Sequence, residues 1–191
     1  MKDKFVYSIK GILKFLALGG VIAAAIMAPN AVSSFKFLFR DENFVSWKNF
    51  NRKRTKQYIG YLVKKKYIKR ARKNGKIEYK ITEKGKGRIT KYELNEIRLS
   101  KNKNWDGKWR IVTFDIPEKY KQARDAVTQK LKKIGMFQLQ KSVFVYPFEC
   151  KKEIDFVSDY FGVYDHILYL EAKIFDIDTK LLNEFGLKRL K

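Results

Sequence analysis

Basic side chains are concentrated in one stretch of this 191-residue chain. Residues 51–103 hold 20 Lys and Arg against 4 Asp and Glu, within a whole-chain net charge of +23. Because a solvated surface normally mixes both signs, this block predicts a polyanionic partner, either nucleic acid or an anionic membrane. The candidate contact residues are Arg52, Lys53, Arg54, Lys56, Gln57, Arg72, Lys73, Asn74 and Lys76.

Three residues outside this block have types that could do catalytic or metal chemistry. Asp115 follows an apolar run, where its carboxylate could help to hold Mg²⁺ or could cap a helix that starts near Pro117. His166 is the only histidine, and we expect a structural role for it. Cys150 is the only cysteine, which excludes a Cys-ligated zinc site and a disulfide framework and predicts a cytoplasmic protein.

The first group of basic candidates belongs to an expected helix. Asn51 is a good N-cap, and the residues that follow it place Thr55, Ile59, Leu62 and Val63 on one helical face. The basic residues occupy the remaining surface of the helix. The pattern therefore predicts an amphipathic helix with a basic polar face, especially in its first two turns.

The second group belongs to an expected hairpin. Tyr67-Ile68 opens one strand, Lys76–Thr82 forms the other, and Asn74-Gly75 between them is the strongest local signal for a two-residue turn. A further helix is expected over residues 86–99. A helical core, a basic helix and a hairpin with a basic tip follow one another in the order of a winged helix-turn-helix, whose helix enters the major groove of DNA.

An uncharged stretch from Phe15 to Phe35 raises the alternative of a membrane span or a signal peptide. Gly19-Gly20 and Pro29-Asn30 interrupt it, which leaves Val21–Ala28 as the continuous apolar piece, too short to cross a bilayer. We expect helices over residues 5–18, 21–28 and 31–39 in the core of the first domain, and no membrane partner.

The second half alternates strand and helix patterns. Strands are expected over Trp109–Asp115, Met136–Gln140, Ser142–Pro147 and His166–Lys173, with helices over Glu118–Ile134 and Lys151–Phe161 and a last helix over Asp178–Gly186. The order β-α-β-β-α-β predicts a ferredoxin-like domain. The fold class is therefore α+β, with a winged helix-turn-helix and linker helix over residues 1–100 and a ferredoxin-like domain over residues 105–191.

The segment WDGKWRIVTFDIPEKYKQARDAVTQKLKKIGMFQLQKSVFVYPF, from Trp105 to Phe148, resembles the central domain of PaaX-type transcriptional repressors. VTFDIPE and LQKSVFVYP carry the match. That domain is similar to the small CRISPR adaptation nuclease, a ferredoxin-like homodimer. PaaX-type proteins also carry a winged helix before this domain and a further domain after it, and we expect this chain to lack the latter.

The resemblance implies a homodimer that presents two winged helices to a palindromic operator in double-stranded DNA. We predict a transcriptional regulator, a repressor, with no catalytic activity and no cofactor, and we identify no small-molecule effector. The alternative is a Mg²⁺-dependent nuclease, because the resemblance matches Asp115 to an aspartate that helps the nuclease to bind metal across its dimer.

Overall fold

The computed structural model describes residues 2–19, 52–73, 75–100, 104–173 and 177–188. By contacts the chain divides into two compact units, Met1–Glu93 and Leu94–Lys191. The expected helices over 21–28 and 31–39, the N-cap Asn51 and the turn residue Asn74 lie outside the described residues. No helix in the described ranges is long and apolar enough to cross a membrane.

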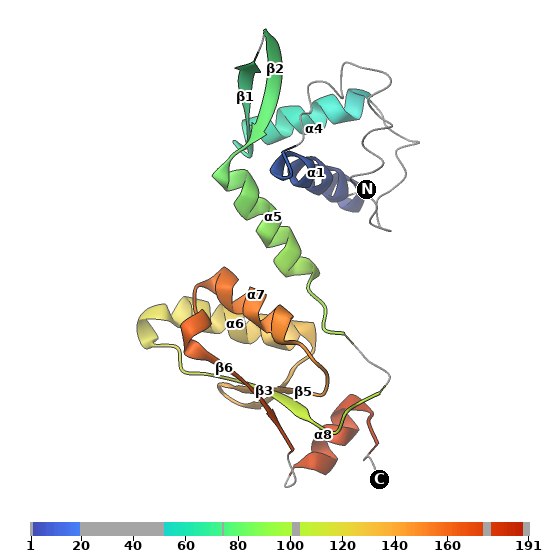
Figure 1. The fold of residues 1–191 in the computed structure, drawn as a ribbon, viewed down its shortest axis with the longest axis vertical. Helices are drawn as coiled ribbons and strands as arrows, with labels where there is room; N and C mark the ends of the chain where they lie inside the picture. Colours follow the sequence, from blue (N-terminus) through green and yellow to red (C-terminus); the bar gives the residue numbers. More distant parts are fainter. Residues whose placement is uncertain (1, 20–51, 74, 101–103, 174–176, 189–191) are drawn as a thin grey trace. The chain divides into compact units, whose positions relative to one another are not determined.

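The described part of the first unit contains two helices, followed by a hairpin and most of a third helix (Figure 1). Helix α1 spans Lys2–Ala17 and helix α4 spans Arg52–Lys64, which agrees with both expected helices. Strands β1, Ile68–Lys73, and β2, Lys76–Ile81, form an antiparallel two-stranded sheet. Their shared core consists of Ile9, Leu13, Phe15, Leu16, Ile59, Leu62, Ile68, Ile89 and Tyr92.

Helix α5 spans Glu83–Glu96, three residues earlier at each end than the expected helix over 86–99. The reason lies at Thr82, whose hydroxyl oxygen accepts a hydrogen bond from the Gly85 amide at 3.1 Å. This is the usual geometry of an N-cap threonine. Residues 83–85, which precede the expected helix, therefore belong to the first turn of α5, and residues 97–99 of the expected helix lie beyond its end.

The second unit contains a four-stranded antiparallel sheet, with strands in the order β4-β5-β3-β6. Strands β3, Trp109–Phe114, β4, Phe137–Gln140, β5, Val143–Tyr146, and β6, Ile167–Ala172, agree with the expected strands to within two residues at each end. Helix α6, Lys121–Ile134, connects β3 to β4, and helix α7, Lys151–Phe161, connects β5 to β6. This is the β-α-β-β-α-β order of the ferredoxin-like arrangement.

Helices α6 and α7 cover one face of that sheet, where Val112, Phe114 and Phe144 meet Leu131 and Ile154 in the main core. A short 3-10 helix, Glu118–Tyr120, precedes α6, so the expected helix over 118–134 consists of two parts. Glycine ends both long helices, because Gly135 and Gly162 adopt the left-handed conformation with φ of 103° and 66°.

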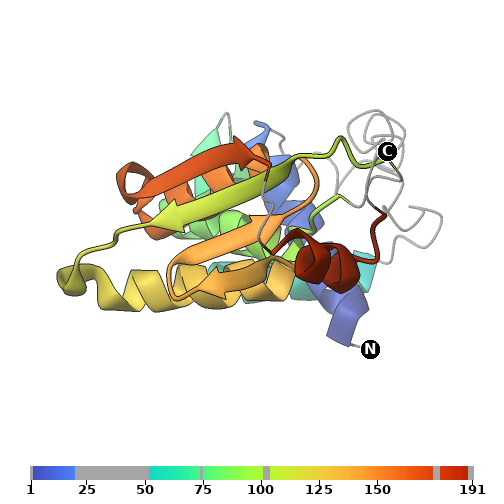
Figure 2. The ribbon, with the colours of Figure 1, turned by 90° about the horizontal axis from the view of Figure 1, so that it is seen from below.

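Helix α8, Asp178–Phe185, packs on the opposite face of the sheet (Figure 2). Its Leu181 and Leu182 join Trp109 and Val145 in a separate small core. The indole Nε1 of Trp109 donates to the carboxylate of Asp178 at 3.1 Å. Helix α8 covers part of this face, and β6 lies at the edge of the sheet.

Candidate nucleic-acid interface

Helix α4 turns its apolar face inward and leaves basic residues outside. Ile59 and Leu62 are buried, whereas Lys56 and Gln57 are exposed. The backbone of Arg52, Lys53 and Arg54 forms the first turn of α4, while their side chains lie outside the described part of the chain. The predicted amphipathic pattern is therefore present at each α4 position whose side chain is described.

A tight junction connects α4 to the hairpin. The Lys66 amide donates to the carbonyl of Val63, and the Tyr67 amide donates to that of Leu62, both at 2.9 Å. Lys66 has φ of 58° and so adopts the left-handed conformation, which this type of helix end requires of one residue. Glycine is the usual residue there, because a side chain makes this conformation unfavourable by about 1–2 kcal/mol. The structure thus places an exposed lysine where the backbone favours glycine.

Thr82 and Gly85 fix the other end of the hairpin. The Thr82 hydroxyl is 2.8 Å from the Lys66 carbonyl and 3.0 Å from the Tyr67 carbonyl. A β-carbon added at Gly85 would lie 2.1 Å from the Tyr67 carbonyl oxygen, so only glycine fits. The start of α5, the end of α4 and the base of the hairpin are thereby held together.

The hairpin turn has the predicted length. Lys73 pairs with Lys76, which leaves a two-residue turn, and Gly75 has φ of 71°. Arg72 is exposed near the tip. The strand positions of Lys73 and Lys76 are defined by the register, but their side chains, like Asn74 as a whole, fall outside the description.

Several cationic groups in the first unit lie over aromatic rings. The Arg70 guanidinium lies 6.0 Å from the Tyr79 ring centroid, and that of Arg88 lies 4.5 Å from the ring of Tyr92. Two ion pairs are found among the described residues of this unit, Lys14 with Glu93 and Lys86 with Glu83. The remaining cations leave a strongly positive surface, which is the electrostatic requirement for binding a polyanion.

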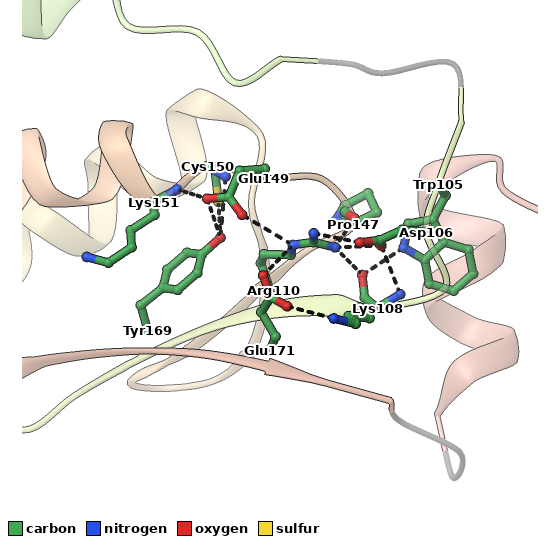
Figure 3. Close-up of polar contacts among 10 residues, drawn as sticks. All are labelled: Trp105, Asp106, Lys108, Arg110, Pro147, Glu149, Cys150, Lys151, Tyr169 and Glu171. Atoms are coloured by element: carbon green, nitrogen blue, oxygen red, sulfur yellow. Dashed lines mark hydrogen bonds and ion pairs between the residues drawn. The ribbon is translucent and has the colours of Figure 1, made fainter.

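In the second unit, Arg110 is a buried cation that contacts carboxylates instead of aromatic rings (Figure 3). Arg110 is 6% exposed, and its two terminal nitrogens each donate to the carboxylate of Asp106 at 2.7 Å. Its Nε lies 3.8 Å from the Glu149 carboxylate and 3.6 Å from that of Glu171. The bond to Arg110 lowers the pKa of Asp106 to about 2 and, in return, raises the pKa of Arg110.

Cys150 lies beside this network at the start of α7. Its backbone amide is 3.4 Å from the Tyr169 hydroxyl, which in turn donates to Glu149 at 3.2 Å. Burial raises the pKa of the Cys150 thiol to about 12, so it stays protonated at neutral pH and is a poor nucleophile. The geometry is that of a structural anchor, in which Arg110 joins β3 to the loop before α7.

Asp115 is exposed just after β3, and its backbone amide donates to the carbonyl of His166 at 3.1 Å. Within the described ranges its carboxylate makes no hydrogen bond, and neither the 3-10 helix nor α6 has a side-chain cap. Its expected alternative role as a helix cap is therefore not seen. Nor does any group of three or more His, Cys, Asp and Glu side chains converge there in the described residues. The described residues of one copy therefore do not supply the carboxylates that a catalytic Mg²⁺ site needs.

Residues 102–181 match the family model of the PaaX protein central Cas2-like domain. This part of the chain is similar to the central domain of PaaX-type proteins. The resemblance based on VTFDIPE and LQKSVFVYP is thereby confirmed, and the PaaX-type domain includes Asp115, Arg110 and all four strands of the larger sheet. No curated protein is significantly similar to the chain.

Two basic residues outside the sequence-predicted contact set are brought together by the strand register. Lys69 in β1 lies opposite Lys80 in β2, and both are exposed. This pairing could be predicted from the length of the turn, because a two-residue turn that pairs residue 73 with residue 76 also pairs residue 69 with residue 80. Counting charges along the chain does not show this pairing.

Proposed function

We propose that the protein is a DNA-binding transcriptional regulator, a repressor, and that its first unit is a winged helix. The observation that carries the proposal is the basic surface of α4 and the hairpin, joined in one chain to a PaaX-type central domain. The order α1, α4, hairpin, α5 supports a winged helix in which α4 is the recognition helix and the hairpin is the wing. The nine basic-block candidates named in the sequence analysis would then contact double-stranded DNA.

We further propose that the protein binds a palindromic operator as a homodimer through its second unit. The support is an exposed apolar patch on edge strand β6, where Leu168 and Leu170 are 62% and 48% exposed. The register places these leucines beside Thr113 and Ile111, on the sheet face that α8 partly covers. Exposed apolar side chains in a row are typical of a protein interface. A twofold dimer would present two copies of α4 to two half-sites.

The proposal assigns no catalytic step to Asp115 and requires no cofactor. The nuclease alternative would need a second copy of the chain to complete a metal site, since the described residues of one copy do not form one. Mg²⁺-dependent cleavage of DNA or RNA that disappears in Asp115→Asn would replace the regulator proposal.

The test of the recognition helix is the variant Arg52→Ala/Lys53→Ala/Lys56→Ala. Removal of three phosphate-neutralising charges should lower DNA affinity and reduce the salt slope, log Kd against log salt, by about 2–3. The matched control is Lys121→Ala/Lys132→Ala/Lys133→Ala on α6, which removes the same charge from the second unit. Unchanged affinity and slope in the α4 variant would contradict the assignment of this helix.

A further inference from the structure

The two faces of the hairpin have different chemistry. Side chains alternate along each strand, and the register puts Ile68, Tyr79 and Ile81 on the face that packs into the first core. The opposite face carries the remaining alternate positions: Lys69, Ala71, Lys73, Lys76, Glu78 and Lys80. We call these six residues the lysine face. Four of the six are lysines, and one is acidic.

Like charges lie directly opposite each other on the lysine face. Lys69 pairs with Lys80, and Lys73 pairs with Lys76. Cross-strand pairs of equal charge destabilise a hairpin, whereas opposite charges stabilise it. The second unit follows the stabilising rule, because Arg110 in β3 lies opposite Glu171 in β6, with Nε 3.6 Å from a carboxylate oxygen. Folding alone therefore does not explain the lysine face.

Among the described residues, no carboxylate forms an ion pair with Lys69 or Lys80, the cross-strand pair whose side chains are described. Lys69 and Lys80 are both exposed. Glu78, half-buried, is the single acidic residue on this face and lies opposite Ala71. An external anion whose negative charge repeats along the strands would match the four lysine positions of this face.

We propose that the lysine face is a binding site for the phosphodiester backbone of DNA, independent of base sequence. The inference rests on the proposed function and adds Lys69 and Lys80 to its contact residues. Lysine presents a mobile point charge that suits phosphate but does not read base edges. An anionic membrane is disfavoured, because this face offers no large apolar side chain for insertion.

Binding at this face couples to the stability of the hairpin. In free protein the Lys69–Lys80 repulsion weakens the strand pairing, and a phosphate chain laid along the face relieves it. Any ligand that binds the folded state in this way stabilises it by mass action. Salt should also stabilise the free first unit, since screening reduces the same repulsion.

The first experiment measures the DNA affinity of the full chain with Lys69→Gln/Lys80→Gln over a range of salt concentrations. The two ligands are a duplex that the wild type enriches from random double-stranded DNA, used as the operator, and an unrelated duplex. We expect affinity to fall roughly 3- to 10-fold on both duplexes and the salt slope to decrease by about 2. The ratio of the two affinities should not change. The control Lys121→Gln/Lys132→Gln removes two exposed lysines from α6 and should leave the affinity and the slope near wild type.

Two single variants separate a phosphate site from a structural effect. Lys80→Glu puts opposite charges across the strands, so we expect a higher thermal midpoint of unfolding at low salt together with weaker DNA binding. Glu78→Gln removes the carboxylate between the lysines and should increase DNA affinity about twofold. A structural role alone would change the midpoint of Lys80→Glu and leave its DNA affinity unaltered.

Four outcomes would overturn the inference. Unchanged affinity and slope in Lys69→Gln/Lys80→Gln, while the α4 triple variant loses binding, would refute the lysine face and leave the proposed function standing. If Lys69→Gln/Lys80→Gln bound the operator more weakly but the unrelated duplex as well as wild type does, these lysines would be base-reading residues. If Lys69→Gln/Lys80→Gln lost binding to vesicles of anionic lipid but kept its DNA binding, the lysine face would be a membrane site. Wild-type protein that binds no duplex would refute both proposals together.

Discussion

At the residue scale, the molecule uses arginine and lysine in two distinct ways. Arg110 is buried and neutralised by Asp106, with Glu149 and Glu171 within 4 Å. Lys69 and Lys80 are exposed and face each other. A buried charge that loses its partner is strongly destabilising, whereas an exposed charge costs little. The first arrangement therefore serves folding, and the second is available for a ligand.

The variant Asp106→Asn tests the anchoring role of Arg110. It removes a two-bond ion pair from a buried guanidinium, and we expect a loss of about 1–2 kcal/mol in the free energy of unfolding of the second unit, less than for a fully buried pair because Asp106 is half exposed. Urea denaturation of both proteins at pH 7 measures this loss. Equal midpoints would show that Asp106 contributes nothing to stability.

The same pair has a defined pH dependence. The pKa of Asp106 is about 2 in the folded chain, below the usual value of about 3.9 in unfolded peptides. Its stabilisation is therefore complete above about pH 4 and disappears as the pH falls through about 2. The difference in stability between wild type and Asp106→Asn should narrow over that interval.

At the element scale, the junction of α4, the hairpin and α5 depends on close backbone approach. Thr82 caps α5 and also bonds to the carbonyls of Lys66 and Tyr67, and Gly85 lets α5 lie against the Tyr67 carbonyl. If α4 is the recognition helix and the hairpin the wing, this junction sets their relative position. A change here should therefore affect folding and DNA binding together.

Two glycines in α5 allow a matched test of this junction. Gly85→Ala would place a β-carbon 2.1 Å from the Tyr67 carbonyl oxygen, and we expect a loss of about 2–3 kcal/mol in the free energy of unfolding of the first unit. Gly87 has open space around it, so Gly87→Ala should instead stabilise the helix by about 0.5–1 kcal/mol. Chemical denaturation measures both, and equal effects of the two variants would contradict the close approach.

The local signals explain why most elements could be predicted from the sequence. Apolar spacing located α1, α4, α6 and α7, and in the structure Gly135 and Gly162 follow the last residues of α6 and α7. The start of α5 was placed too late, because Thr82 and Gly85 resemble a turn until their contact with Tyr67 is known. The Arg110 network could not be predicted, since it depends on three segments far apart in the sequence.

At the scale of the whole molecule, charge and apolar surface are separated along the chain. Residues 51–103 hold most of the excess positive charge, whereas residues 105–191 hold 16 basic and 13 acidic residues. The exposed leucines of β6 lie in this nearly neutral part. A nearly neutral dimer interface avoids strong self-repulsion between copies, while the basic unit remains free for DNA.

The variant Leu168→Gln/Leu170→Gln tests the dimer interface. Because both side chains are already exposed, the substitutions should leave the stability of one chain almost unchanged and remove apolar contact between two chains. Sedimentation should then show a monomer where the wild type is a dimer, with weaker binding to a two-half-site operator. A variant that remains dimeric would place the interface elsewhere.

Selection of binding sites from random double-stranded DNA by the full-length chain is the most direct test of the central claim, a dimeric regulator that reads DNA with its first unit. We predict a palindromic consensus whose half-sites are separated by one helical turn, or a multiple of it, because a twofold dimer presents two recognition helices. Enrichment of no sequence, under conditions where the protein binds DNA, would contradict a sequence-specific regulator.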